Sequence, residues 1–267
     1  MDLIIFYFSE GTSISALTMI EFNYFNYIWI AIAVVTFLIL VSFNIKAPYG
    51  RHSNNKWGAM ISNKWGWFLM ELPAFILMPA LSLSGPSPKD NLTFLLIILW
   101  LIHYGFRTLM FPFKLKTNKK EIPIFVVFCG LFFNSINGFL NGYYLGFLSQ
   151  ENNHILTLNV IVGIGVFFLG IFVNRTSDAK LISLRESHDD YLIPNGGLFN
   201  YISCPNYFGE ILEWLGFMLI AWNLPAATFF IWTISNLIPR SLSHHEWYQG
   251  KFKNYPKNRK AIIPFVW

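Results

Sequence analysis

The stretch "SCPNYFGEILEWLGF", residues 203–217, is as apolar as a membrane-spanning helix, yet it contains Asn206, Glu210 and Glu213. Side chains three or four positions apart share one face of an α-helix, so these three residues would form one polar stripe. A charged side chain at the centre of a bilayer costs about 2.5 to 3.5 kcal/mol on insertion scales and usually faces an internal cavity. The stretch therefore predicts a membrane helix whose polar face lines a site inside a bundle.

The composition of the whole chain extends this prediction. Of its 267 residues, 54% are hydrophobic and only 12% are charged, whereas soluble domains carry about a quarter charged residues. Segments long enough to cross about 30 Å of hydrocarbon occur at residues 24–45, 65–83, 92–113, 122–147, 155–173, 206–222 and 225–238. We therefore predict an all-α bundle of seven transmembrane helices, formed as a single membrane-embedded domain over residues 1–267.

The basic residues predict how this bundle is oriented. They concentrate in alternate loops, namely Lys46, Arg51, Lys56 and Lys64, then Lys114, Lys116, Lys119 and Lys120, then Arg175, Lys180 and Arg185, and finally the tail from Arg240 to Lys260. The positive-inside rule places such loops in the cytosol, so the N-terminus is expected outside and the C-terminus inside. The net charge of +5 is then explained by topology, and no nucleic-acid partner is expected.

Further polar residues lie within the other spans. Glu71 occurs in "FLMELPAF", and His103, Tyr104 and Arg107 occur in "IHYGFR". At 1.5 Å of rise per residue, all of them fall in the half of the bundle nearest the cytosol. We expect them to face a cavity that opens there.

The fourth span, "NSINGFLNG" and its continuation, carries two stripes. One holds the amides of Asn134, Asn137 and Asn141, and the other holds Gly138, Gly142 and Gly146. Small residues at this spacing let helix backbones approach closely. The glycines therefore predict a helix-packing face.

The two segments that follow the fifth and seventh spans repeat the pattern. If the helices continue beyond the membrane, two polar faces result, one with Asn174, Asp178 and Arg185 and the other with Arg240, His244 and Tyr248. Together with the spans, these faces suit one lipid-like ligand and one water-soluble anionic ligand. The adjacent His244, His245 and Glu246 diverge on a helix and Cys129 and Cys204 have no ligand spacing, so no metal site is predicted.

Simpler explanations compete with these functional ones. Glu71 lies near Pro73 and could satisfy a backbone carbonyl that the proline leaves without a donor. Arg107 could form a purely structural ion pair with Glu210 or Glu213. The residues alone leave both explanations open.

Several motifs resemble the membrane steroid 5α-reductases. They are "FLMELPAF", "HYGFR", "NRTSDAKLISLR", "NGGLFNYISCPNYFGEILEWLGF" and "HHEWYQGKFKNYPKNRKAIIPF", which occur in the family's order between about Pro48 and Trp267. The resemblance implies an integral membrane enzyme of seven helices that uses NADPH to reduce the Δ4 double bond of 3-oxo steroids. We expect a bacterial or other microbial member, in the bacterial inner membrane, or in the endoplasmic reticulum if the source is eukaryotic.

The resemblance also implies residue roles. Glu71 and Tyr104 match the pair placed at the steroid 3-oxo group, as catalytic residues. The matches to positions that line the NADPH site are Asn174, Asp178, Arg185, Asn206, Glu210, Arg240, His244 and Tyr248. Met70 departs from the family, whose members have Gln before the catalytic glutamate.

Other functions fit part of these observations. The chain could reduce another conjugated double bond, in a sterol, a polyprenol or an enoyl thioester. It could also be a membrane methyltransferase similar to the isoprenylcysteine carboxyl methyltransferases, or a transporter whose intramembrane charges conduct ions. The expected partners are the lipid bilayer and an apolar, steroid-like substrate, and we expect a monomer.

Overall fold

The computed structural model describes residues 17–115, 120–150, 156–187 and 190–266. The predicted loop lysines Lys116 and Lys119 and the predicted start of the fifth span, Ile155, lie outside the described residues. Most of the described chain is helical. The long helices are α1 (Met19–Ser42), α2 (Asn63–Ser84), α3 (Asn91–Leu109), α5 (Ile124–Tyr143), α6 (Leu158–Ser187), α7 (Pro205–Ala221) and α8 (Leu224–Lys251).

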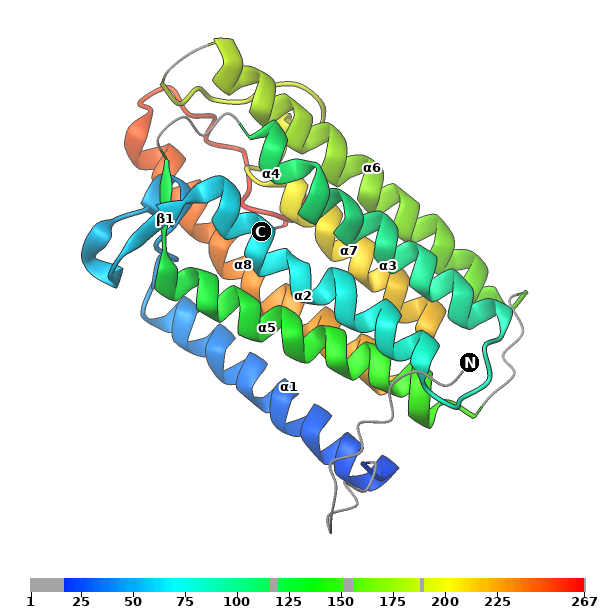
Figure 1. Cartoon of the computed structure of the whole chain (residues 1–267). Coiled ribbons are helices and arrows are strands. Elements are labelled where there is room, and N and C mark those ends of the chain that lie inside the picture. Colours follow the sequence, from blue (N-terminus) through cyan, green and yellow to red (C-terminus); the bar gives the residue numbers. More distant parts are fainter. Residues whose placement is uncertain (1–16, 116–119, 151–155, 188–189, 267) are drawn as a thin grey trace.

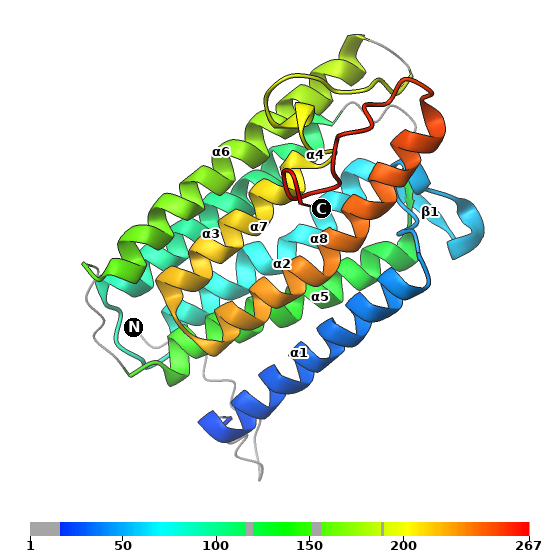
Figure 2. The same ribbon diagram turned by 180° about the vertical axis from the view of Figure 1, so that it is seen from behind.

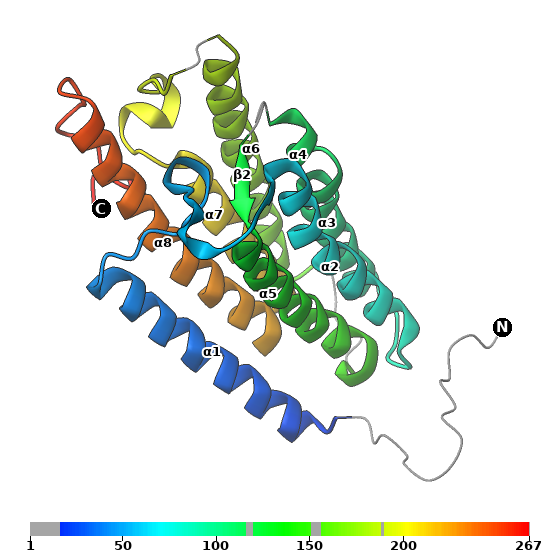
Figure 3. The ribbon, with the colours of Figure 1, turned by 60° about the vertical axis from the view of Figure 1, so that its left-hand side comes forward.

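Shorter elements connect these helices. They are η1 (Gly50–His52), η2 (Asn55–Trp57), β1 (Met60–Ser62), α4 (Phe111–Lys114), β2 (Glu121–Pro123), the π-helical turn η3 (Tyr144–Leu148) and η4 (Gly197–Asn200). The sequence did not predict any strand, but β1 and β2 form one antiparallel pair in which Ile61 lies opposite Ile122. The pair ties the segment before α2 to the segment before α5, and Figure 3 shows β2 above the start of α5.

The long helices lie in two rows. In one row α1 packs on α8, α8 on α7, and α7 on α6, while in the other row α2 lies between α5 and α3. Contacts of α3 with α7 and of α5 with α8 join the rows. Helix α1 lies at one edge of the bundle and α6 along the opposite edge (Figure 1), and the view from behind shows α8 next to α1 (Figure 2).

Glycines allow the closest approaches between helix backbones. A β-carbon on Gly142 of α5 would lie 2.7 Å from the carbonyl oxygen of Met78 in α2, and one on Gly146 would overlap the carbonyl oxygen of Leu81. The predicted packing face of Gly138, Gly142 and Gly146 is therefore confirmed. A second glycine-lined contact joins α6 to α7, where a β-carbon on Gly170 would lie 2.6 Å from the carbonyl oxygen of Gly209.

Helix α1 is held by fewer contacts. Thr18 and Glu21 form a capping box at its N-terminus, which satisfies backbone N–H groups that have no partner within the helix. Its buried side chains, Phe22, Asn26, Trp29 and Ala33, recur every three or four residues, and Asn26 accepts a hydrogen bond from the Thr228 hydroxyl of α8 at 3.1 Å. Most of the remaining surface of α1 is exposed and apolar, as expected of a helix that faces lipid.

The C-terminal tail folds back over one end of the bundle. Ser203 donates its backbone N–H to the carbonyl of Lys260 at 2.8 Å, and Cys204 donates to Ala261 at 3.1 Å. Arg259 reaches the carbonyl oxygen of Pro194 at 3.1 Å. The tail thus anchors the loop that leads into α7, at the end where β1, β2 and α4 also lie (Figure 1).

The helices begin within a few residues of the predicted spans, whereas α6 and α8 continue well beyond the predicted ends at residues 173 and 238, to Ser187 and Lys251. Five segments among the described residues are long and apolar enough to cross a membrane: Met19–Ser42, Asn63–Ser84, Asn91–Lys114, Ile124–Leu148 and Leu158–Arg185. The other two predicted spans coincide with α7, which has only 17 residues, and with the first half of α8. The structure thus supports five spans directly.

Candidate active site

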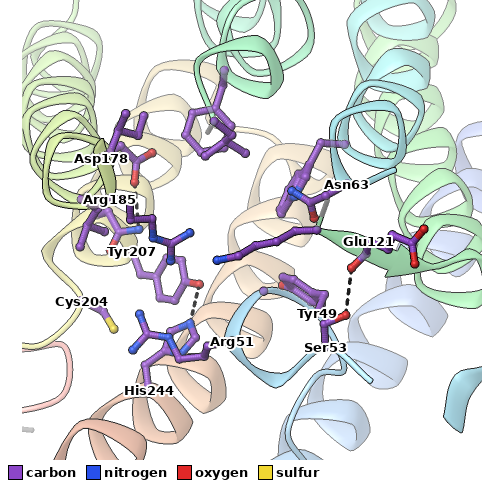
Figure 4. Close-up of a pocket in the computed structure, with 18 of the residues that line it drawn as sticks. Tyr49, Arg51, Ser53, Asn63, Glu121, Asp178, Arg185, Cys204, Tyr207 and His244 are labelled. Atoms are coloured by element: carbon purple, nitrogen blue, oxygen red, sulfur yellow. Dashed lines mark hydrogen bonds between the residues drawn. The ribbon is translucent and has the colours of Figure 1, made fainter. Parts of the chain in front are cut away.

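A cavity of about 440 Å³ opens at the end of the bundle that carries the predicted cytosolic loops. The cavity walls come from residues 49–67, 111–115, 120–121, 178–185, 203–207 and 244–248. Figure 4 shows Tyr207 and His244 on one side of it and Tyr49, Ser53 and Asn63 on the other. Segments that are distant in sequence therefore meet around one polar space.

The cavity contains most of the predicted cofactor-binding residues. Those that line it are Asp178, Arg185, Asn206, His244 and Tyr248. The amide of Asn206 donates to the Asp178 carboxylate at 3.1 Å. These side chains come from α6, α7 and α8, so the bundle joins the separate polar faces that the sequence predicted.

Three of the predicted residues are not among those that line the cavity. Asn174 is buried and donates from its amide to the backbone carbonyl of Asn206 at 3.0 Å, which leaves its own oxygen without a partner. The guanidinium of Arg240 lies over the ring of Tyr49 at 4.3 Å. Glu210 follows Asn206 by one turn of α7 and is half-buried. Asn174 and Arg240 thus hold lining residues in place.

The structure adds two basic residues that sequence reasoning missed at this site. Arg51, Lys120 and Arg185 all line the cavity, and their charged groups lie 5.2, 5.1 and 5.0 Å from the centre of the Tyr191 ring. Arg51 and Lys120 were interpreted as charges that set topology. Residues 49–52, "YGRH", also resemble the steroid 5α-reductases, and this motif was the signal that could have identified Arg51.

Two histidines at the cavity are stacked. The rings of His52 and His244 lie 5.5 Å apart. Both are outside the predicted spans, since His52 lies between the first two spans and His244 follows the last one. Burial, and then the charge of Arg51, lower the pKa of both imidazoles, that of His244 well below its usual range. Both rings are therefore neutral at pH 7, and His244 pairs with the hydroxyl of Tyr207 at 3.1 Å.

The two predicted catalytic residues lie deeper in the bundle, in one hydrogen-bonded cluster. Glu71 of α2 forms an ion pair with Arg107 of α3, with 3.2 Å between Oε1 and the guanidinium nitrogen. Tyr104 donates its hydroxyl to the amide oxygen of Asn134 at 3.2 Å, and the amide nitrogen of Asn134 lies 3.5 Å from Glu71. Both predicted catalytic residues are buried, and both contact Asn134.

The glutamates of the opening stretch have separate surroundings. Glu213 is fully buried and pairs with His103 of α3 at 2.8 Å, so it does not share a cavity-lining stripe with Asn206. Arg107 pairs with Glu71 and not with Glu210 or Glu213. Glu213 therefore forms a structural hydrogen bond with His103, whereas the ion pair of Arg107 is formed with Glu71.

Aromatic rings join the deep cluster to the cavity. Trp67 and Phe111 line the cavity, and the guanidinium of Arg107 lies 5.1 and 4.5 Å from their ring centres. The Glu71–Arg107 pair thus lies directly behind the inner wall. A ligand in the cavity would have one end among basic residues and the other against this apolar wall.

Met70, where the sequence departs from the resemblance, packs into an apolar cluster with Ile122 and Val127. Its side chain lies against Gly130 of α5. The position therefore contributes packing in this chain.

His245, considered as a metal ligand, contacts Ser203 at 2.6 Å, and the described residues contain no group of His, Cys, Asp or Glu that could hold a metal ion.

Unpartnered polar atoms test whether a nucleotide fits the cavity. Around it, Arg51 Nη1, Tyr49 Oη, His244 Nδ1 and His52 Nε2 are buried without a hydrogen-bond partner. Buried polar atoms of this kind normally find partners, and the phosphate and ribose groups of a nucleotide would supply them. Three cations and a volume in the range of small-molecule sites fit the same ligand class.

Comparisons with known proteins agree with this geometry. Residues 120–267 match the family model described as 3-oxo-5-alpha-steroid 4-dehydrogenase. The chain is 38% identical to steroid 5-alpha-reductase DET2 of Gossypium hirsutum over 251 residues, which cover 91% of this chain and 97% of the relative. It is 36% identical to 3-oxo-5-alpha-steroid 4-dehydrogenase 1 of Homo sapiens, with 82% and 85% covered. These relatives are plant and animal proteins, so the expected microbial origin gains no support.

Proposed function

The chain belongs to the 3-oxo-5-alpha-steroid 4-dehydrogenase family, and as an oxidoreductase of this family it reduces the steroid Δ4 double bond; on this premise we propose which residues carry the reaction. Glu71 and Tyr104 polarise the 3-oxo group of the substrate. The basic cavity holds NADPH. The whole chain acts as a single membrane-embedded domain.

One observation carries this proposal. Glu71 and Tyr104 come from different helices, yet both contact the same amide, that of Asn134, and the Glu71–Arg107 pair lies behind the inner wall of the cavity. A carboxyl group and a tyrosine hydroxyl are thus close together at the apolar end of a site whose other end is basic. This arrangement suits a carbonyl substrate and an anionic cofactor that meet inside the bundle.

The family typically uses a nicotinamide cofactor, and we propose NADPH in particular. When bound, this cofactor supplies the hydride that forms the new bond at C5 of the steroid. Arg51, Lys120 and Arg185 provide three positive charges around Tyr191. Charge-assisted hydrogen bonds from such groups are about twice as strong as neutral ones, which favours the cofactor with the additional phosphate. Asn206, His244 and Tyr248, with Asn174, Asp178, Glu210 and Arg240 around them, would bind its neutral groups or support those that do.

The chain's own residues act on the substrate oxygen. As the C5–H bond forms, negative charge develops on the 3-oxo oxygen, and hydrogen bonds aimed at that atom lower the barrier. The Tyr104 hydroxyl can donate one of them. Glu71 accepts hydrogen bonds from Arg107 and lies near Asn134 in the structure, so a donor role requires that it bind a proton. C4 then takes a proton from water or from a tyrosine.

We propose seven spans, with the N-terminus outside and the cavity facing the cytosol. The cavity is lined by basic residues from alternate loops, and the positive-inside rule favours the cytosol for these loops. The enzyme would act as a monomer in the endoplasmic reticulum of a eukaryote or in the inner membrane of a bacterium. A steroid-like substrate would enter from the bilayer.

Purified protein tests the proposal. NADPH should raise the thermal unfolding temperature, and product analysis with progesterone should show the 5α-dihydro steroid. Glu71→Gln and Tyr104→Phe should each lower kcat by about 10²- to 10³-fold, the usual cost of losing one oxyanion donor, while NADPH still stabilises the protein.

Matched controls are available for both substitutions. Glu21→Gln changes an exposed glutamate at the start of α1, and Tyr143→Phe removes a hydroxyl that accepts from the backbone of Leu17. Both should keep wild-type kcat. Full activity in Glu71→Gln or in Tyr104→Phe would refute the assignment of that residue.

A further inference from the structure

Asn134 of α5 lies between the two proposed catalytic residues. Its amide oxygen accepts from the Tyr104 hydroxyl at 3.2 Å, and its amide nitrogen is 2.6 Å from the carbonyl oxygen of Met70 and 3.5 Å from Glu71 Oε2. Only 6% of its surface is exposed. One side chain thus joins α2, α3 and α5 at the site.

The orientation of this amide follows from its partners. A backbone carbonyl can only accept, so the nitrogen of Asn134 must face Met70. The amide oxygen then faces Tyr104, and the tyrosine must be the donor in that hydrogen bond. The hydroxyl proton of Tyr104 is therefore directed at Asn134 when no substrate is bound.

The ring of Tyr104 has little freedom to move. It packs against the rings of Trp100 and His103, whose centres are each 4.9 Å from its own. The indole N–H of Trp100 in turn donates a hydrogen bond to the carbonyl oxygen of Ala74 at 2.9 Å. Rotation about the bond between the ring and the hydroxyl oxygen can still redirect the proton. The oxygen stays where Asn134 and the surrounding rings hold it.

The other two amides of the same stripe face elsewhere. Asn137 accepts from the indole of Trp29 at 3.3 Å and donates to the carbonyl of Phe133 at 2.7 Å. Asn141 donates to the carbonyl of Asn137 at 3.0 Å. The three asparagines share a residue type and a helix, but among the described hydrogen bonds Asn134 alone contacts Tyr104, the backbone carbonyl of Met70 and the carboxylate of Glu71.

We propose that Asn134 is a positioning residue for the reduction, which sets the place of the Tyr104 hydroxyl relative to Glu71 and holds its proton until the substrate oxygen replaces the amide as acceptor. This inference rests on the proposed function of Glu71 and Tyr104. Because the hydroxyl oxygen is already in place, substrate binding requires only rotation of one hydrogen. Without Asn134 the hydroxyl could turn to other acceptors, Glu71 included.

Variants of Asn134 test the inference. Asn134→Ala, and Asn134→Leu, which fills the volume, should each lower kcat with progesterone by about 10- to 100-fold, as expected when a reacting group is misplaced by about 1 Å. KM should change by less than about threefold. Asn137→Ala, the matched control, removes the two hydrogen bonds of this side chain to Trp29 and Phe133; it should lose comparable thermal stability and keep kcat within about twofold of wild type, because buried hydrogen bonds away from the site contribute to stability.

A double-mutant cycle separates positioning from packing. If Asn134 acts through Tyr104, adding Asn134→Ala to Tyr104→Phe should lower kcat by less than about threefold further, measured with radiolabelled steroid over long incubations. Losses that multiply, or an Asn134→Ala enzyme with the kcat of Asn137→Ala, would overturn the inference. So would failure of both Asn134 variants to fold, which would mark a purely structural residue. Full activity of Tyr104→Phe would instead refute the proposed function, and the inference with it.

Discussion

Alanine at Gly170 tests whether the close contact of α6 with α7 holds the site together. A β-carbon there would lie 2.6 Å from the carbonyl oxygen of Gly209 and 2.7 Å from Cα of Glu213. Both are backbone atoms, so no side-chain rotation can relieve the overlap. The two helices must separate, and the separation would reach the Glu213–His103 pair and the bond from Asn174 to Asn206.

The size of the effect follows from these contacts. Overpacking of a core costs about 1 to 3 kcal/mol. We expect the upper part of this range, about 2 to 3 kcal/mol, because the added β-carbon on α6 would meet backbone atoms of α7, which cannot rotate away. For a chain of this size each kcal/mol corresponds to about 2 to 4 °C in the unfolding temperature. Gly170→Ala should therefore unfold about 5 to 10 °C below wild type.

The matched control lies on the same helix. Gly165 has nothing within 4 Å of the position of an added β-carbon, so Gly165→Ala should unfold within about 1 °C of wild type. Tryptophan fluorescence of the detergent-purified proteins during heating measures both variants. Equal unfolding temperatures for Gly170→Ala, Gly165→Ala and wild type would refute the reasoning that backbone contact at Gly170 holds α6 and α7 together.

Two further predictions concern the cavity. Lys120→Ala and Arg185→Ala should each weaken NADPH binding by about 10-fold or more, the cost of one charge-assisted hydrogen bond. Both substitutions should weaken NADH binding less, because NADH lacks the additional phosphate. Equal losses for both cofactors in a binding titration would argue against a contact with that phosphate. The pKa values of His52 and His244 are lowered in the folded chain, so the unfolded chain takes up protons first as the pH falls below about 6.5, and stability is lost on acidification. His52→Gln should therefore lose less unfolding temperature than wild type between pH 7 and pH 5, and an unchanged loss would contradict this origin of the acid sensitivity.

The helices could be predicted because their signal is local. Apolar runs such as residues 65–83 and 92–113 coincide with α2 and with α3 and α4 to within a few residues. The β1–β2 pair was not predicted, since three-residue strands whose partners lie about sixty residues apart leave no periodic pattern. Two cysteines without disulfide or ligand spacing are predicted to be small buried residues; this is right for Cys204 and wrong for Cys129, which is exposed on α5.

The sequence predicted which kinds of residue form the site and, in part, which of them lie next to one another. The polar faces of α6 and α8 were correctly derived from helical spacing, and five of the eight predicted cofactor residues line the cavity. Arg51 and Lys120 were missed because a loop charge that sets topology and one that binds a ligand look identical in sequence. Their position depends on how loops fold over the end of the bundle.

The sequence by itself determined the long helices, the end of the bundle on which basic residues gather and, through motifs, the residues to consider. Only the tertiary structure decided the partners: Glu71 with Arg107, Glu213 with His103, and Asn134 with Tyr104. Hydropathy depends only on consecutive residues, so it predicts a helix without knowledge of the tertiary contacts. Pairing depends on the rotation of each helix and its order in the bundle, which are set by close contacts such as Gly170 on Gly209 between segments distant in the chain.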